Sequence, residues 1–539
     1  MGKRDLQRRL ERDYGRAPDA VYFPEDMGNI RAYFDYRRDQ GRDAFLLDET
    51  TWNDLDLDRL FQRINPRLST SGEQYLYYLL RAPALDAETL RARRALVELV
   101  SRDPRRRLEL QVILGRLGCT RRADLALTFA PEAGDRRRLA LFLILGPLLP
   151  LLLALPGALL NPALLGLAGV SVLLNLTLHE FLKRRVQRKF DTVNYAAAMI
   201  LALHRIRKLR DPALDQELAA AYPALDRLRS VLRVGGVSSA QDGGILEFFV
   251  GIFLLDLISY EYLRDKLSRC REEVFTVHEC LGRLDAAIAA ASYRESLGDG
   301  CCDAELDFDA EAPYLSLRGL RHPLLSHAVP NDLETRRSVL LTGSNASGKS
   351  TFLRTVLLCA VMAQSLGFCP AERYRAPAFR ILSSMALRDD LLTGESYYIV
   401  ETRSLKRILD AAVGSPPLLC VVDEVLRGTN TVERIAASCE VLRSIPQGNA
   451  LCLAATHDGE LCTLLAGRYD LYHFTETVGE TEMTFDYRLR PGPATSRNAI
   501  RLLGLLGFPE TVVEGAQRRA EDFLREGRWR PDSGETPGS

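Results

Sequence analysis

The 539-residue chain has little lysine, no net charge and, apart from Cys301-Cys302, no closely spaced cysteines. Only seven of its 71 basic residues are lysine, which indicates a coding preference for arginine rather than a function. The 71 basic residues balance 71 acidic ones, so no overall basic field favours nucleic acid, and only local patches would bind it. The eleven cysteines form no C-x-x-C pair and no His/Cys group at metal-ligand spacing. No metal cluster is therefore expected, and the pattern suits a reducing compartment.

The sequence also shows no secretory signal, and its length is greater than that of a typical single domain. Its first ten residues are charged and contain no apolar h-region. A length of 539 residues is more than one hydrophobic core usually organises, so two to four domains are expected. Residues 46–117 and 181–298 show helical apolar spacing, and Ser69 to Glu73 is a plausible helix cap. After residue 300, short apolar runs alternate with helical stretches, which indicates a parallel sheet.

One forty-residue segment, 139–178, contains no Asp, Glu, Lys, Arg or His. Forty helical residues measure about 60 Å, roughly two crossings of a 30 Å hydrocarbon core. Pro156-Gly157 and Asn161-Pro162 provide a turn in the middle, and basic runs at 136–138 and 183–185 flank both ends. A transmembrane hairpin with both ends in the cytoplasm is therefore predicted. The alternative is a buried helical hairpin of a soluble domain. A shorter apolar stretch, residues 245–257, carries two acidic residues and predicts a core helix.

Residues 343–350 read Gly-Ser-Asn-Ala-Ser-Gly-Lys-Ser, after a buried-strand pattern and before a helical one. In such a P-loop, backbone N–H groups wrap phosphates and the helix N-terminus adds positive potential. Lys349 is expected to reach the β- and γ-phosphates of ATP, and the Ser350 hydroxyl to ligate Mg²⁺. The predicted nucleotide-binding residues of this segment are Gly343, Ser344, Asn345, Ala346, Ser347, Gly348, Lys349, Ser350 and Thr351.

Two further apolar runs end in polar residues with complementary chemistry. Leu418 to Val422 precedes Asp423 and Glu424, which is typical of a Walker B strand. Asp423 is expected to hold the Mg²⁺ shell while Glu424 polarises the attacking water, because one carboxylate cannot be both metal ligand and free base. A third run ends at His457, which would sense the γ-phosphate or orient water. Lys349, Glu424 and His457 are therefore the predicted catalytic residues.

These motifs resemble those of the MutS family of DNA mismatch-repair ATPases, a branch of the ABC-type ATPases. The P-loop has the family's Asn at 345, residues 423–430 resemble its Walker B and following loop, and residues 455–457 resemble its switch histidine. Outside these motifs, 321–323 and 65–80 are similar to the approach to the P-loop and to the start of the family's helical core. The resemblance implies an ATPase domain of this type behind a helical core.

The resemblance also implies residues that act between subunits. Segment 388–401 looks like the family's signature, from which Ser396 would reach across a homodimer to the γ-phosphate on the opposite subunit. Residues 496–509 are similar to the C-terminal dimerisation segment. Tyr487 stands where the family often places a ring against adenine.

Several features depart from the family. Only about forty residues precede the core, whereas a mismatch-reading domain needs on the order of a hundred. Phe-x-Glu tripeptides, the family's base wedge, occur at Phe23, Phe474 and Phe508, but none lies in such a domain, so they are interpreted as chance. Asn430 replaces the commoner Ser or Thr, and Tyr397-Tyr398 the commoner Thr-Phe. The apolar hairpin lies near where the family inserts its DNA-gripping clamp.

The sequence therefore predicts a multidomain chain, with an α-helical core and lever region containing a transmembrane hairpin, followed by an α/β P-loop ATPase domain of the ABC type. The predicted boundaries are an N-terminal segment of helix or loosely docked arm (1–44), the first part of the helical core (45–138), the hairpin (139–178), the second part of the core and lever (179–314), the ATPase domain with its dimerisation segment (315–525) and a disordered tail (526–539).

Two functions remain open at this level. The leading hypothesis is a membrane-anchored, homodimeric MutS-like ATPase whose nucleotide state moves long helices against the hairpin. The alternative is a clamp on mismatched or branched DNA that uses arginines in 102–138 and 183–210. A transporter is disfavoured, because two crossings per chain form a poor translocation path. ATP and Mg²⁺ are the only cofactors implied.

Overall fold

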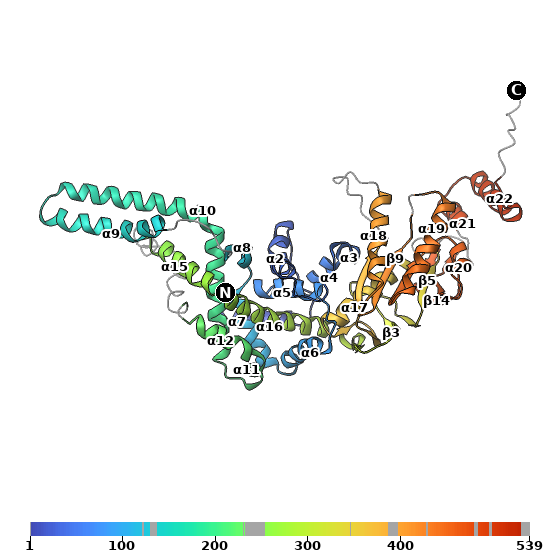
Figure 1. Ribbon diagram of the computed structural model, residues 1–539, viewed down its shortest axis with the longest axis horizontal. Helices are drawn as coiled ribbons and strands as arrows, with labels where there is room; N and C mark the ends of the chain where they lie inside the picture. Colours follow the sequence, from blue (N-terminus) through green and yellow to red (C-terminus); the bar gives the residue numbers. More distant parts are fainter. Residues whose placement is uncertain are drawn as a thin grey trace, which may run out of the picture. The chain divides into compact units, whose positions relative to one another are not determined.

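The computed structural model describes residues 2–120, 123–129, 137–229, 231, 254–344, 347–385, 397–426, 429–478, 483–494 and 499–529 (Figure 1). The chain forms two compact units. The helical unit consists of Met1–Leu46, Asp58–Pro83 and Glu88–Gly298. The sheet unit consists of Leu47–Leu57, Ala84–Ala87 and Asp299–Ser539. The predicted combination of a helical region with a following α/β region is confirmed.

The helical unit contains α1 (Lys3–Asp13), α2 (Pro24–Gln40), α4 (Leu57–Ile64), α5 (Thr70–Arg81), α6 (Ala87–Arg102), α7 (Pro104–Leu117), α8 (Leu125–Thr128), α9 (Arg137–Leu159), α10 (Ala163–Arg207), α11 (Pro212–Leu218), η1 (Ala219–Ala221), α12 (Tyr222–Arg227), α15 (Leu255–Arg269) and α16 (Arg271–Leu297). The sequence left residues 1–44 open between helix and loose arm. They form α1 and α2, and α2 packs on α5 by burying Ile30, Tyr33 and Phe34. Of the predicted core helix at 245–257, residues 245–253 lie outside the described residues.

The centre of this unit is the contact between α5 and α16, whose backbones approach closely at two glycines. A Cβ at Gly72 would lie 1.9 Å from Asp285 Oδ2, and one at Gly282 would lie 2.6 Å from Tyr75 Cβ. The predicted cap of α5 is confirmed, because Ser69 Oγ accepts from the Gly72 amide at 3.0 Å. The same hydroxyl donates to Asp285 Oδ2 at 2.5 Å, so the cap also links the two helices.

The predicted apolar hairpin is formed by α9 and the first part of α10, joined by a turn at 160–162. Ala163–Phe181 is the one segment of the described residues that is long and apolar enough to cross a membrane, and 22% of it is buried. The apolar part of α9 found among the described residues, Leu145–Leu159, is shorter. The hairpin is thus present, while two membrane crossings remain a prediction.

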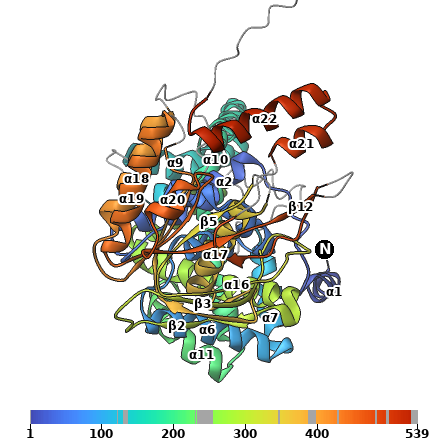
Figure 2. The ribbon, with the colours of Figure 1, turned by 90° about the vertical axis from the view of Figure 1, so that its right-hand side faces the viewer.

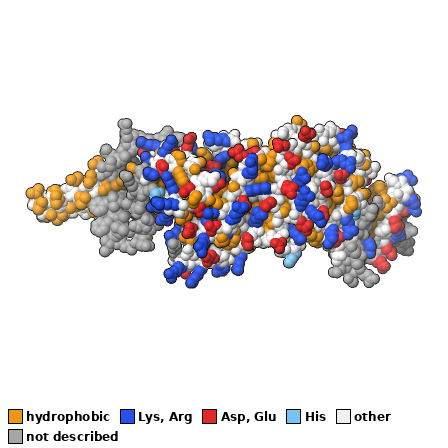
Figure 3. All heavy atoms as spheres, turned by 90° about the horizontal axis from the view of Figure 1, so that it is seen from below, with side chains coloured by type: hydrophobic (Ala, Val, Ile, Leu, Met, Phe, Trp, Pro, Cys, Tyr) orange, Lys and Arg blue, Asp and Glu red, His pale blue; other side chains and the backbone are white. Residues whose placement is uncertain are grey.

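In the α9–α10 hairpin, several polar side chains are buried and many large apolar side chains are exposed. Ser171, Asn175 and His179 follow one another at intervals of four residues on α10 and are buried. Pro150 has no N–H to donate to the carbonyl of Gly146 four residues earlier, and Asn175 Nδ2 donates to that oxygen at 2.8 Å. The exposed apolar side chains gather over the α9–α10 hairpin (Figure 3). They are Leu145, Leu148, Leu149, Leu151, Leu152, Leu155, Leu159, Leu160, Leu165, Leu167, Val170, Leu173, Leu174 and Phe181.

The sheet unit is organised by a six-stranded sheet (Figure 2). Its strand order is β14 (Arg490–Pro491), β11 (Tyr469–His473), β5 (Ser338–Thr342), β10 (Ala450–Ala455), β9 (Leu418–Asp423) and β8 (Arg380–Ser384). The strands from β11 to β8 are parallel, and β14 pairs antiparallel at the edge. The carboxyl ends of β5, β10 and β9 therefore lie next to one another, because Ala455 is in register with both Leu341 and Asp423.

Smaller sheets and helices complete this unit. The four-stranded sheet has the order β2 (Glu305–Asp307), β7 (Arg373–Pro377), β3 (Leu315–Leu320) and β4 (Asn331–Thr335), and the two-stranded pairs are β1 (Cys302–Asp303) with β6 (Phe368–Cys369) and β12 (Glu476–Val478) with β13 (Met483–Phe485). The helices are α3 (Glu49–Asp54), η2 (Gly298–Gly300), α17 (Lys349–Ser365), α18 (Tyr397–Ala411), α19 (Thr431–Ser444), η3 (Ile445–Gln447), α20 (Glu460–Leu464), α21 (Ala499–Leu505) and α22 (Glu510–Glu526).

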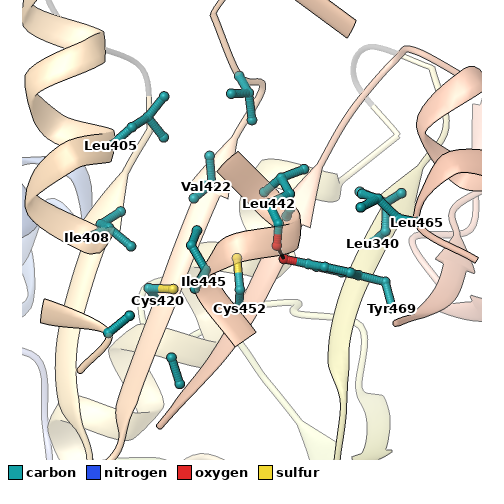
Figure 4. Packing of buried hydrophobic residues seen from close by; sticks show 14 of the residues in the cluster. Leu340, Leu405, Ile408, Cys420, Val422, Leu442, Ile445, Cys452, Leu465 and Tyr469 are labelled. Atoms are coloured by element: carbon teal, nitrogen blue, oxygen red, sulfur yellow. Dashed lines mark hydrogen bonds between the residues drawn. The ribbon is translucent and has the colours of Figure 1, made fainter. Parts of the chain in front are cut away.

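One face of the six-stranded sheet forms a core with α18 and α19 (Figure 4). Ile408 and Leu442 pack there with Cys420 and Cys452, which are in register on β9 and β10. The Tyr469 hydroxyl donates to the Leu442 carbonyl at 2.7 Å, so the one polar group of that ring is satisfied within the core. Helix α17 also contacts β8, β9 and β10. The central strands are therefore packed against helices α17, α18 and α19.

A short segment from the N-terminal part of the chain also belongs to the sheet unit. Asp54, at the end of α3, accepts from Ser383 Oγ at 2.6 Å and from the Met385 amide at 3.0 Å. Thr51 Oγ1 accepts from the Ser383 amide at 3.1 Å. Helix α3 thus holds the carboxyl end of the edge strand β8.

Candidate active site

A cleft of about 500 Å³ opens beside the P-loop. It is lined by Leu320, His322, Leu325, His327, Ala328, Val329, Asn331, Ser344, Ser347, Gly348, Lys349, Ser350, Thr351, Phe352, Thr355, Glu424, Phe474 and Tyr487. One wall is polar and comes from the P-loop, and the other is largely apolar and comes from the segment between β3 and β4. Such a pairing suits a ligand with a charged and an aromatic part.

The P-loop runs from β5 into α17, as the sequence predicts. Gly343 and Gly348 have φ angles of +137° and +106°, which residues with a Cβ rarely adopt. A Cβ at Gly343 would also lie 2.7 Å from the Phe474 carbonyl oxygen. Lys349 is the first residue of α17, and its Nζ donates to the carbonyl oxygens of Gly343 at 2.7 Å and Ser344 at 2.8 Å. The ammonium group is therefore held inside the loop, where it meets the phosphate-binding backbone.

The remaining P-loop residues lie at the same place. Ser350 and Thr351 are exposed in the first turn of α17 and line the cleft, whereas Ser347 is buried. Asn345 and Ala346 lie outside the described residues. Asp423 ends β9 and is 6% exposed. A hydroxyl and a carboxylate are the oxygen donors that Mg²⁺ prefers, so Ser350 and Asp423 fit the predicted metal site in chemistry.

Glu424 and His457 meet directly across the ends of β9 and β10. His457 Nε2 lies 2.6 Å from Glu424 Oε1, and both side chains are partly exposed. The Glu424 amide donates to the Ala455 carbonyl at 3.0 Å, and the Thr456 amide donates to the Leu341 carbonyl at 3.0 Å. Backbone hydrogen bonds therefore continue the sheet past its strands and bring the two side chains together. Of the two, Glu424 lines the cleft.

Helix α19 fixes the loop that carries His457. Arg434 makes a two-pronged contact with Asp458, from Nε at 3.1 Å and from a terminal nitrogen at 2.7 Å. This contact raises the pKa of Arg434, mainly through the hydrogen bond that the guanidinium donates to the Asp458 carboxylate. Asn430 caps α19, because its Oδ1 accepts from the Glu433 amide at 3.0 Å. Asn is as good a cap as Ser or Thr, which accounts for the departure noted at this position.

Comparison with known proteins places these motifs in a family. The family model "MutS domain V" matches residues 339–524, which contain the P-loop, the Walker B strand and His457. Residues 339–524 of this chain therefore form a domain of the MutS family. The DNA mismatch repair protein MutS of Natronomonas pharaonis is 33% identical over 283 residues, which cover 50% of this chain and 31% of that protein. The proteins of the same name from Pseudothermotoga lettingae and Thermus thermophilus are 37% and 35% identical, over 38% of this chain and 26% and 25% of their own lengths. The chain thus spans less than a third of the curated MutS proteins it matches.

Tyr487, which the MutS resemblance assigned to adenine, lies against the P-loop. A Cβ built on Gly348 would lie 3.1 Å from its ring, and its backbone has φ +53°. Asn331 fixes this conformation, because its Nδ2 donates to the Tyr487 carbonyl at 3.0 Å and its Oδ1 accepts from the Leu489 amide at 2.7 Å. The tyrosine is 45% exposed and lines the cleft.

Sequence reasoning missed the apolar wall of the cleft. His322 was quoted for its resemblance to the MutS family but was given no role, and Ala328, Val329 and Asn331 were not singled out. Burial, followed by the nearby Arg354 charge, lowers the pKa of His322 to about 4. Its imidazole is therefore neutral at physiological pH and adds no charge to this wall. The Arg-His-Pro motif was the one local signal for this segment.

The Phe-x-Glu tripeptide at Phe474 lies beside the P-loop. The Phe474 amide donates to the Thr342 carbonyl at 3.2 Å, and Glu476 Oε2 accepts from Ser344 Oγ at 2.9 Å. The tripeptide thus braces the P-loop, and its Glu476 is a second residue near the site that the sequence did not reveal. Ser396 and the signature residues 388–396 lie outside the described residues, as do 496–498 of the dimerisation segment.

Proposed function

We propose that the chain hydrolyses ATP with Mg²⁺ at this cleft and uses the nucleotide cycle to move the helical unit. The observation that carries the proposal is the convergence of Lys349, Asp423, Glu424 and His457 at the adjacent carboxyl ends of β5, β9 and β10. Phosphoryl transfer needs positioning and charge stabilisation more than covalent chemistry, and these residues supply both.

Each residue has a role that follows from its place. Lys349 and the amides of the P-loop bind the phosphates, and the Tyr487 ring stacks on the base. Glu424 accepts the proton of the attacking water, while His457, at 2.6 Å, holds the Glu424 carboxylate in place. Ser350 and Asp423 would hold Mg²⁺, which would supply positive charge to the phosphates.

Three variants test the ATPase. Lys349→Ala is expected to abolish nucleotide binding, whereas Glu424→Gln should bind ATP and lose hydrolysis by about 100-fold or more, measured by phosphate release. Lys406→Ala is the matched control, because Lys406 is an exposed lysine of the sheet unit that pairs with Asp410 at 2.7 Å. Full hydrolysis by Lys349→Ala would overturn the proposal.

We also propose that the hairpin of α9 and α10 anchors the protein in a membrane. A soluble hairpin exposes polar groups and buries apolar ones, and this hairpin does the opposite. Each leucine favours insertion by about 0.5 kcal/mol at a helix centre, so the twelve exposed leucines favour it by several kcal/mol. The segment 139–178 contains no charged residue to oppose this term.

The anchor is tested by fractionation. The full chain is expected in the membrane fraction after carbonate washing, and to float with phospholipid vesicles, whereas deletion of 139–178 should release it while ATP hydrolysis persists. A full-length protein that stays wholly soluble without detergent would rule the anchor out. Two crossings with both ends in the cytoplasm would leave cysteines placed on either flank inaccessible from outside.

We also propose that the chain forms a homodimer, because the resemblance to the MutS family implies one. Leu502, Leu506, Phe508 and Val512 are exposed on α21, α22 and the turn between them, and no residue of α22 is buried. An apolar helix pair of this kind favours a second copy. In that dimer Ser396 would complete the opposite ATP site. Leu506→Glu is expected to dissociate the dimer in light scattering and to lower hydrolysis.

The second candidate function is a clamp on mismatched or branched DNA, and the names of the MutS relatives favour it. It predicts retention of branched duplexes that weakens steeply as salt rises, because arginine–phosphate contacts release counterions. Absence of retention at low salt would exclude it and leave the membrane-anchored ATPase.

A further inference from the structure

The segment that follows the Walker B strand has an unusual backbone. Glu424 and Leu426 both have φ +58°, although neither is glycine. A non-glycine residue in this left-handed region costs about 1 kcal/mol or more, so surrounding contacts must hold it. The strain falls on Glu424 itself and on the residue two positions after it.

Three contacts from three elements hold this segment. The amide of Glu424 is bonded to Ala455 on β10, as described above. The Val425 carbonyl accepts from Ser438 Oγ of α19 at 3.2 Å. The Leu426 amide donates to Glu401 Oε1 of α18 at 2.6 Å. The last contact is the shortest of the three, and it involves an ionisable acceptor, which makes it the strongest type.

The Glu401 side chain is buried, so it faces the Leu426 amide and not solvent. It lies in the second turn of α18 and is 4% exposed. Burying a carboxylate is costly unless hydrogen bonds compensate, so a purely structural position on this helix would favour an apolar residue. The neighbouring positions 402 and 403 of the same helix are exposed.

We propose that Glu401 is a positioning residue for ATP hydrolysis, which acts through the Leu426 amide to hold the Glu424 carboxylate against His457. Without this acceptor, Leu426 relaxes to negative φ and turns the peptide units on its N-terminal side. The Glu424 side chain then leaves its 2.6 Å contact with His457. Glu401 itself does not line the cleft, so nucleotide binding remains intact. The inference rests on the proposed ATPase function.

Substitutions at 401 separate this role from a structural one. Glu401→Ala is expected to lower kcat by about 10- to 100-fold, the range for a displaced catalytic group, with the Kd for ATP changed by less than about twofold. Glu401→Gln keeps an oxygen acceptor and should recover most of the rate. The matched control is Asp410→Ala, which removes an exposed carboxylate from the same helix. Unchanged kcat in Glu401→Ala, or equal loss of kcat and ATP affinity, would contradict the role.

A double-variant cycle keeps the test decisive if Glu401→Ala folds poorly. Glu401→Leu fills the buried position without an acceptor and should lower kcat as Glu401→Ala does. Residues that act as a unit are strongly non-additive, so adding Glu401→Leu to Glu424→Gln should cost no further rate. Independent, multiplied losses would overturn the proposal. A wild-type chain that does not hydrolyse ATP, with no effect of Lys349→Ala, would instead refute the proposed function itself, so the two failures are distinct.

Discussion

Two carboxyl groups buried between α5 and α16 are expected to make the stability of the helical unit depend on pH. Glu73 is 2% exposed, and Asp285 is 3% exposed. Burial raises the pKa of Glu73 to about 7, partly opposed by the Arg67 charge, and burial raises the pKa of Asp285 to about 7, partly opposed by the hydrogen bond from Ser69. Both carboxyls therefore prefer to be protonated in the folded protein.

The two raised pKa values determine in which direction, and by how much, the stability of the helical unit changes with pH. Below about pH 3 both groups are largely protonated in the folded and unfolded chains, and they alter stability little. As the pH rises the unfolded chain ionises first, so stability is lost progressively until the pH passes about 7. For Glu73 the difference from an ordinary pKa of 4.5 is worth about 3 kcal/mol at pH 8.

The variant that checks this is Glu73→Gln, which removes the ionisation and keeps the shape. Hydrogen exchange of the α5 and α16 amides, corrected for intrinsic rates, gives the local opening free energy at pH 5 and pH 8. The variant should be more stable than wild type by about 3 kcal/mol at pH 8 and by about 1 kcal/mol at pH 5. Glu98→Gln, an exposed residue of α6 that pairs with Arg102, is the control. Stability that rises between these pH values, or an unchanged slope in Glu73→Gln, would refute the reasoning.

Three further outcomes are expected. Asn175→Leu should destabilise the hairpin by about 1 kcal/mol, because the Gly146 carbonyl, to which Pro150 cannot donate, then loses the Asn175 donor. The measurement is faster hydrogen exchange of the α9 amides in detergent. Gly72→Ala should prevent stable folding in thermal melts, whereas Gly28→Ala, in a helix with no atom within 4 Å of the new Cβ, should be neutral or stabilising by up to about 1 kcal/mol. Asp54→Ala should lower the melting temperature and expose Trp52, now 1% exposed, as a red shift of its fluorescence, because two buried donors lose their acceptor.

The parts of the site that could be predicted from the sequence are those set by local order. A buried strand, a glycine-containing turn and a helix start follow one another along the chain at Gly343 to Lys349, and Asp423 and His457 come directly after apolar runs. Parallel strands then bring these ends together without further information. The hairpin could also be predicted from local sequence, because its apolar run and its central prolines and asparagine are contiguous.

What could not be predicted depends on pairs that are distant in the sequence. Asn331 holds Tyr487 across 156 residues, and Ser344 donates to Glu476 across 132. Glu401 lies only 25 residues before Leu426, but their contact depends on how α18 packs on the sheet. Asn, Glu and Ser are common surface residues, so composition and spacing carry no signal for such contacts. The N-terminal helices were uncertain for the same reason, since α1 packs on α7 and α2 packs on α5.

The sheet unit is discontinuous, and this limits how the protein can be divided. A recombinant fragment begun at Asp299 would include every motif residue but neither α3 nor Ala84–Ala87. Ser383 Oγ and the Met385 amide would lose Asp54, and Gln364, which donates to the Ala84 carbonyl at 3.1 Å, would lose that acceptor. A catalytic fragment that dispenses with the hairpin should therefore retain residues 47–57 and 84–87, either by internal deletion or by supplying the N-terminal segment as a separate chain.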